Sequence, residues 1–206
     1  MLKIREFDEM SEITGLLAQS LAGPVGGDIP QDVAVTIRAA KKQMEGLPEV
    51  IEDLNLAFSR YLTLNESLGR MWVLASESSH MVDGPQVLAV RQDMEEEFQA
   101  LARVVAAEAG HKRFQGSSLT IMDAGSALTA ASILSCLKPV MEKLDHELRG
   151  QKELIMEAIA ETMNFLGIVA MSYPEADGVA GIRETLSRVK LPQTIEGPIV
   201  HAPTLH

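Results

Sequence analysis

The sequence predicts an all-α protein: an elongated antiparallel helical bundle of three to four long helices, with short flanking helices and a small irregular or β-like loop near residues 113–123. Two observations support this fold class. Apolar residues recur at steps of three and four through most of the chain, which is the spacing of one helix face. Hydrophobic residues make up 46% of the 206 residues but aromatic ones only 4%, a balance typical of helices packed through Leu, Ala and Met. We expect residues 1–189 to form a single elongated helical domain, followed by a Pro-spaced extended tail at 190–206.

The first element is a short helix over residues 4–21, with Phe7, Ile13 and Leu17 on one side. The run from Gly23 to Pro30 then breaks the helix, because Gly and Pro disfavour helical backbone there. Helical spacing resumes over residues 32–47. Pro48 is expected to open a separate helix, since its missing N–H is harmless in a first turn.

The helix expected after Pro48 carries an apolar seam of the coiled-coil kind, and Asp83-Gly84-Pro85 makes the turn at its end. A second seam follows in the next helix. Two long helices joined by so short a turn must run antiparallel. The seam and core residues predicted for these two helices are Leu54, Phe58, Leu68, Met71, Trp72, Val90, Met94, Phe98, Leu101 and Val105.

The third long element spans about residues 126–171, and its seam includes Leu144, Leu148 and Ile155. Pro139 and Gly150 predict a kink or a break in it. A last short helix is expected over residues 178–189.

The composition excludes several classes of partner. A formal charge of −11 and a pI near 4.9 disfavour nucleic acid and anionic membranes, which bind through clustered Lys and Arg. The lone Cys136 excludes an intramolecular disulfide, and we expect it to be a buried small hydrophobe. The sequence contains no stretch of roughly 18 uncharged apolar residues that would predict a membrane span. Its N-terminus also has no apolar signal core that would predict general secretion, so we expect cytoplasmic synthesis.

Two sequence pairs match the Glu-x-x-His spacing of di-iron helical bundles: Glu77 with His80, and Glu108 with His111. Each pair lies at the C-terminal end of its helix, and the two helices are antiparallel. The pairs are therefore expected roughly 40 Å apart, too far for a joint site. A histidine stabilised by the helix dipole is the plainer interpretation.

The cluster Asp145-His146-Glu147, with Glu142 one turn earlier, is more typical of a solvated ion-pair cluster than of acid–base catalysis. The run Glu95-Glu96-Glu97 is expected on the surface, with one member turned toward a neighbour. No phosphate loop or nucleophile motif stands out. We therefore expect no catalytic residues, no cofactor and no metal, and a protein that is not an enzyme.

Three motifs occur in the order and spacing of the N-terminal conserved region of bacterial flagellins, which this chain resembles over about residues 20–119. They comprise Gln31-Asp32-Val33-Ala34 with Gln43 to Leu47, Arg70-Met71-x-x-Leu74-Ala75, and the Glu97 to Leu119 segment with Phe98, Phe114-Gln115-Gly116 and Leu119. The resemblance implies a structural protein of bacterial motility, exported by the flagellar apparatus, that packs helix faces against like subunits or flagellar partners. Phe114 would close the end of the bundle.

The chain departs from the family at several positions. Only about nineteen residues precede the matched region, and a Pro-spaced tail replaces the family's C-terminal helix. Phe-Gln-Gly stands for Phe-Asn-Gly, and Glu108 occupies an apolar position. These departures count against polymerisation and are compatible with a helical core domain.

Two other interpretations fit the same pattern. A helical bundle of unrelated origin would show the same seams. A cytoplasmic adaptor or export chaperone would bind a partner's amphipathic helix in a groove between its own helices.

Overall fold

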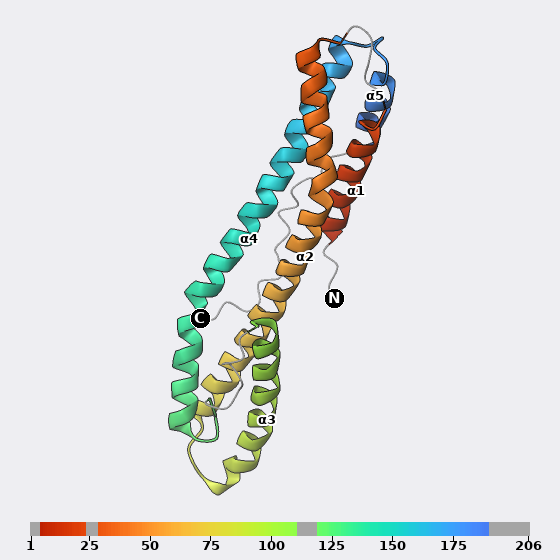
Figure 1. Cartoon of the computed structure of the whole chain (residues 1–206). Coiled ribbons are helices and arrows are strands. Elements are labelled where there is room, and N and C mark those ends of the chain that lie inside the picture. The colour runs from red at the N-terminus through yellow and green to blue at the C-terminus, as the bar shows by residue number, and fades with distance from the viewer. Residues whose placement is uncertain (1–4, 24–28, 111–118, 190–206) are drawn as a thin grey trace. The chain divides into compact units, whose positions relative to one another are not determined.

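The computed structural model describes residues 5–23, 29–110 and 119–189, and every regular element in these ranges is an α-helix (Figure 1). The predicted all-α class is confirmed. Within the described ranges, three helices are long and two are short. In chain order they are α1 (Arg5–Ser20), α2 (Gln31–His80), α3 (Pro85–Glu108), α4 (Ala124–Ser172) and α5 (Val179–Arg188).

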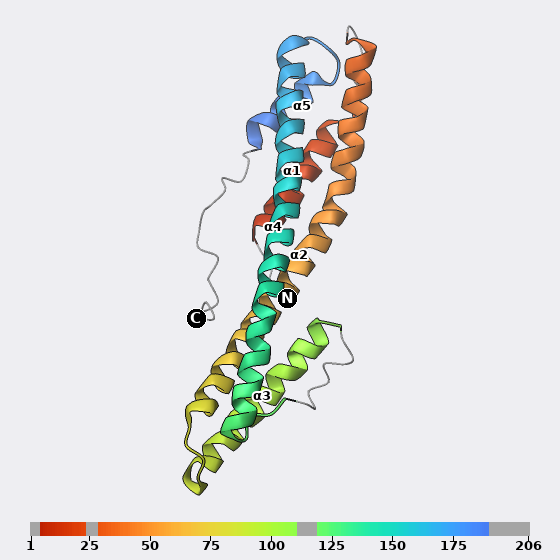
Figure 2. The same ribbon diagram turned by 90° about the vertical axis from the view of Figure 1, so that its left-hand side faces the viewer.

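The helices form two compact units (Figures 1 and 2). Of the described residues, unit 1 comprises 5–23, 29–59 and 148–189, and unit 2 comprises 60–110 and 119–147. Both α2 and α4 contribute to each unit. Unit 1 therefore holds α1, α5 and one part of each long helix, whereas unit 2 holds α3 and the other parts.

Unit 2 contains an antiparallel α2–α3 hairpin with α4 packed on it. The antiparallel direction of α2 and α3 follows from two contacts. Arg70 bonds Glu97, 27 positions away, whereas Ser78, nearer the turn, bonds Arg91, only 13 positions away. Apolar side chains from all three helices bury one another, and Ile121 joins them from the segment before α4. The buried core comprises Leu68, Met71, Leu74, Ala75, Phe98, Ala102, Val105, Ile121, Ala127, Ala130 and Leu134.

Unit 1 is built around α1, whose buried face packs on α5. Phe7 of α1 meets Phe58 of α2 with ring centroids 5.4 Å apart, a distance typical of favourable aromatic pairs. Lys152 of α4 donates to Glu6 at 2.6 Å. The aromatic contact with α2 and the ion pair with α4 together hold α1 against both long helices within this unit.

The expected helix boundary at Pro48 is wrong, because α2 is one helix of 50 residues with Pro48 in its interior. Met44 and Ile51 explain the continuity. Both are buried, and a seven-residue step returns to nearly the same helix face. The apolar seam therefore continues in register past Pro48, and packing on both sides offsets the hydrogen bond that proline removes.

The break considered at Pro139 or Gly150 does not occur either, since α4 is a single helix of 49 residues. In contrast, the turn before α3 follows the sequence closely. Pro85 occupies the first turn of α3. Gly110 follows the C-terminus with φ +64°, a conformation that favours glycine.

The predicted loop near residues 113–123 falls partly on residues 111–118, outside the described part of the chain, and so does Phe114. Residues 119–123, which are described, form no strand.

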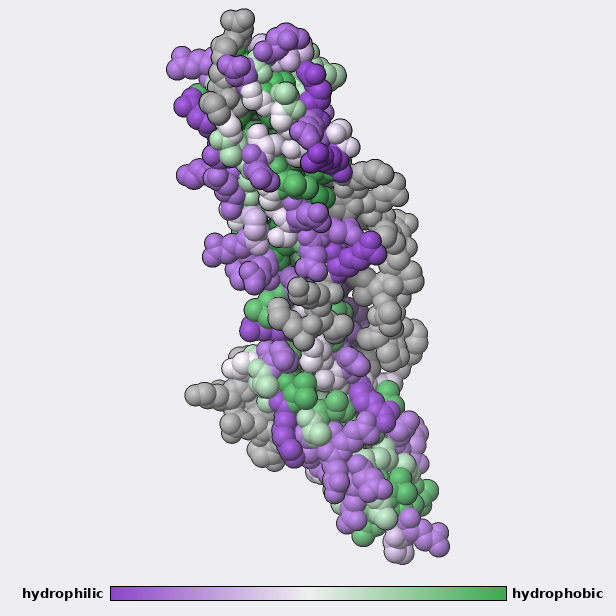
Figure 3. Space-filling view, turned by 90° about the vertical axis from the view of Figure 1, so that its right-hand side faces the viewer, coloured by the Kyte–Doolittle hydropathy of each residue, from purple (hydrophilic) through white to green (hydrophobic). Residues whose placement is uncertain are grey.

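One described helix, α4, is long and apolar enough to cross a membrane by length and composition alone. A third of its most apolar window is buried within the structure, and a core helix of a soluble protein passes the same test. On the face shown in Figure 3, hydrophilic side chains predominate and apolar ones occur in separate patches.

Candidate functional site

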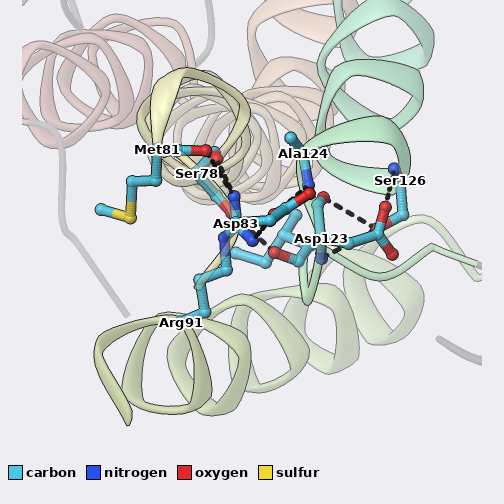
Figure 4. A network of polar contacts seen from close by, with 8 residues as sticks. Ser78, Met81, Asp83, Arg91, Asp123, Ala124 and Ser126 are labelled. Carbon is cyan, nitrogen blue, oxygen red and sulfur yellow. Dashed lines mark hydrogen bonds and ion pairs between the residues drawn. The ribbon is translucent and has the colours of Figure 1, made fainter. Parts of the chain in front are cut away.

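The most elaborate polar cluster of unit 2 surrounds Arg91 of α3, at the turn that joins α2 to α3 (Figure 4). The Arg91 side chain is buried, with 3% of the residue exposed. Its guanidinium donates to the Asp83 carboxylate, to the Ser78 carbonyl at 3.0 Å and to the Met81 carbonyl at 2.8 Å. The two carbonyls lie at the C-terminal end of α2, where helices leave acceptors unpaired. Arg91 therefore caps α2 from the neighbouring helix.

Asp83 extends this cluster toward α4. Its Oδ1 accepts a 3.4 Å hydrogen bond from the Ala124 backbone N–H, at the start of α4. The hydrogen bond from Arg91 holds the pKa of Asp83 below its ordinary value. One carboxylate in the α2–α3 turn thus contacts both α3 and the start of α4.

The segment before α4 is fixed by side chains from α2 and α3. Glu95 Oε2 accepts from the Ile121 N–H at 2.7 Å, and the Ser78 hydroxyl donates to the Ile121 carbonyl at 2.6 Å. Gln99 donates to the Leu119 carbonyl at 2.8 Å. Both backbone groups of buried Ile121 are therefore satisfied by side chains, as buried backbone requires.

Asp123 caps the N-terminus of α4. Its carboxylate accepts from the Ser126 N–H and from the Ser126 hydroxyl, each at 2.9 Å. These bonds lower the pKa of Asp123. A residue of this type before the first turn is the usual start signal for a helix.

A second polar contact joins the middle of the hairpin. Arg70 of α2 donates to both oxygens of Glu97 of α3, at 2.7 and 3.2 Å, and lowers the pKa of that carboxyl. Both side chains are half exposed, so the pair contributes at most about 1 kcal/mol. Its importance is geometric, because it sets one turn of α2 opposite one turn of α3.

Comparison with family models, with curated proteins and with solved structures finds no match for this chain.

The structure places the predicted core residues in both units. Most are buried, whereas Trp72, Met94 and Leu101 are partly buried against the unit 2 core, Leu144 is half-buried and Val90 is exposed. Trp72 also donates its indole N–H to the Ser135 hydroxyl of α4 at 2.9 Å. The buried ones in unit 2 are Leu68, Met71, Phe98 and Val105, and those in unit 1 are Leu54, Phe58, Leu148 and Ile155.

The sequence patterns with metal-ligand or catalytic spacing are not drawn together in the described ranges, which contain no group of three or more potential metal ligands. His80 Nδ1 lies 2.6 Å from the Ser76 carbonyl of its own helix. His111 lies outside the described residues. Glu147 pairs with Lys143 at 3.6 Å on an exposed surface.

Two expectations about single residues are wrong. Cys136 is exposed, because it follows buried Leu134 by two positions and so lies about 200° around the helix. Val90, expected in the seam of α3, is also exposed, and its neighbour Arg91 is buried in its place. Arg91 stands seven residues before Phe98, on the same helix face, which is the signal that could have found it.

Proposed function

We propose that this chain is a flagellin-like structural or interaction protein, which acts by packing helix faces against like subunits or flagellar partners. The observation that carries the proposal is that residues from two of the flagellin-like motifs pack in one core. Met71, Leu74 and Ala75, from the Arg-Met-x-x-Leu-Ala motif, share one buried core with Phe98. These two motifs, which lie apart in the sequence, therefore belong to one packing unit, as a common origin would lead one to expect, whereas the first motif, at residues 31–47, lies in unit 1.

Two further contacts support the proposal. Arg70, the first residue of that motif, pairs with Glu97, the residue before Phe98. Leu119, in the leucine position of the last motif, packs against the same core. The matched segments on α2, on α3 and before α4 of unit 2 thus contact one another or the same core.

Export by the flagellar apparatus is the test. The chain, detected with an antibody in its native host, is expected in the culture medium or the flagellar fraction of cells with an active flagellar export apparatus. It should stay in the cytosol when export is blocked. A cytosolic enzyme measured in the same fractions controls for lysis.

Retention of the chain in the cytosol of cells with an active flagellar export apparatus, as in cells with a blocked one, would contradict the proposal. That outcome favours the second function, a cytoplasmic adaptor or export chaperone, because such a protein works without leaving the cell.

A further inference from the structure

A second row of side chains with helix-contact spacing runs along α4 in unit 1, on the side of the helix away from the core. Its apolar members are well exposed, Leu154 by 65%, Ile168 by 51% and Met171 by 76%. Two of its members are glutamates, Glu157 and Glu161. We call this row the outer seam; it comprises the exposed residues Leu154, Glu157, Glu161, Asn164, Ile168 and Met171.

The spacing of the outer seam is that of a contact between two helices. Its steps of three and four residues average 3.5, which keeps a row of side chains against a neighbouring helix over several turns. The part of α4 in unit 1 already packs on its own unit through another such row, the buried residues Ile155, Ile159, Leu166 and Val169. Glu157, Glu161 and Ile168 each follow one of these by two positions, so they lie about 200° around the helix from it. The outer seam therefore faces away from the packing of its own unit.

The charges of the outer seam indicate which kind of helix fits it. Glu157 and Glu161 stand four positions apart, and like charges at this spacing destabilise a helix. Elsewhere an exposed glutamate has a basic partner at that spacing, as Glu45 has in Lys41 at 3.7 Å. In α4, residues 153–172 include no Lys, Arg or His. The two carboxylates of the seam are therefore left to a counter-charge from outside the helix.

We propose that the outer seam binds a basic amphipathic helix of a partner protein. Lys or Arg side chains of that helix face Glu157 and Glu161, and its apolar side chains face Leu154 at one end and Ile168 and Met171 at the other. The inference names the chemistry of the partner in the proposed function and rests on that function.

The charge pattern distinguishes this occupant from others. An uncharged helix would cover the two carboxylates without supplying a counter-charge, which is costly. A second copy of the chain is repelled, because each copy carries a formal charge of −11. The same charge attracts a basic partner.

The contact is small. One helix laid along another buries less than the roughly 800 Å² per partner of a standard stable interface. We therefore expect a weak complex whose affinity falls with added salt, because the seam carboxylates are exposed to screening.

A designed peptide tests the charge pattern on the unaltered full-length chain. The peptide is a fluorescein-labelled helix of about three heptads, with Leu at positions that face the apolar members of the seam and Lys at those that face the glutamates. Its matched control carries Glu in place of each Lys. Fluorescence anisotropy is expected to show the lysine peptide binding at least about tenfold more tightly than the glutamate peptide.

Two double variants with the same change of charge separate the seam from the overall charge. Glu157→Lys/Glu161→Lys is expected to weaken binding of the lysine peptide at least about tenfold and to strengthen binding of the glutamate peptide. Glu49→Lys/Asp53→Lys, at exposed carboxylates four positions apart on α2, is expected to weaken binding no more than about twofold. Urea unfolding checks that both variants are folded.

A photoreactive cross-linker identifies the natural partner. A benzophenone amino acid in place of Met171, in the full-length chain expressed in its native host, is expected to form an adduct with one other protein. Mass spectrometry of the linked peptide is expected to place the adduct in a segment with two Lys or Arg at a step of three or four.

Equal binding of the two peptides, or equal weakening by the two double variants, would overturn the inference. An adduct with a second copy, with lipid or with a segment that lacks basic residues would also overturn it, as would the absence of any adduct. Failure here, with the chain still found in the flagellar fraction, rejects the outer seam and leaves the proposed function standing. A basic helix linked to a chain that stays in the cytosol rejects only the proposed function.

Discussion

A buried arginine is uncommon, because its guanidinium gives up a water shell and must find other partners. Arg91 finds them in Asp83 and in two carbonyls at the end of α2. Its Nε has no hydrogen-bond partner among the described residues. The side chain is therefore placed by its two terminal nitrogens, and the α2–α3 turn depends on them.

Arg91→Met is expected to lower the free energy of unfolding by about 2 kcal/mol, because it leaves the helix-end carbonyls without their charged donor. Urea unfolding measures it. Arg103→Met, at an exposed arginine of the same helix, is the control and should change stability by no more than about 0.5 kcal/mol. Equal losses in the two variants would contradict the structural role of Arg91.

The Asp83 carboxyl makes part of this stability depend on pH. Its folded-state pKa is lowered by Arg91, so its contribution is fully present above the ordinary aspartate pKa of about 3.9. The contribution is lost as the pH falls through the lower folded value. Asp83→Asn should therefore reduce the urea midpoint at pH 5 to 7, and the difference from the unaltered protein should narrow below about pH 4.

Asp93→Asn, at an exposed carboxylate of α3, corrects for general charge effects in this series. A difference between Asp83→Asn and the unaltered protein that persists unchanged at pH 2.5 would show that the ionised form of Asp83 is not what stabilises the turn.

At the scale of helices, the positions of turns could be predicted where local chemistry decides them. The Asp83-Gly84-Pro85 turn and the glycine after α3 lie where expected. The short helices agree too, since α1 and α5 each end within one residue of the predicted bounds. Gly and Pro act through their own backbone, so their effect on such turns is local.

Predictions failed where tertiary packing overrides local preference. Pro48 lies inside α2 because buried Met44 and Ile51 hold the helix on both sides. Similarly, Val90 and Arg91 exchange their expected places, because a valine favours burial by its type whereas Arg91 is buried by partners distant in sequence. The cluster around Arg91 could not be predicted, since Ser78 and Met81 contribute backbone carbonyls, which any residue carries.

The continuity of α2 predicts the effect of Pro48→Ala. The substitution restores an N–H inside a helix, where proline is about 3 kcal/mol less favourable than alanine. The unfolded chain gains up to about 1 kcal/mol of conformational entropy in return. We therefore expect urea unfolding to show a net stabilisation of about 1 to 2 kcal/mol.

Pro85→Ala is the matched control for Pro48→Ala. Pro85 occupies the first turn of α3, where no helical hydrogen bond is missing, so its replacement should leave stability unchanged or slightly lower. If Pro48→Ala destabilised the protein as Pro85→Ala can, α2 would have to end at Pro48.

At the scale of the whole molecule, the sequence predicts its fold class better than its partners. Helical periodicity reflects the burial of one face in each helix, and it is the same for every bundle. Partners bind to the exposed faces of the helices instead. Which residues are exposed, Cys136 among them, depends on which side of α4 packs on the core. The order of motifs along α2 and α3, together with their shared core, is what supports a flagellin-like role.

The content of purified flagella tests this account most directly. Flagella sheared from the native host and purified should contain this chain, enriched at least about tenfold over a cytosolic marker when quantified by mass spectrometry. A chain present only at the level of the cytosolic marker would contradict a structural or partner role in the flagellum.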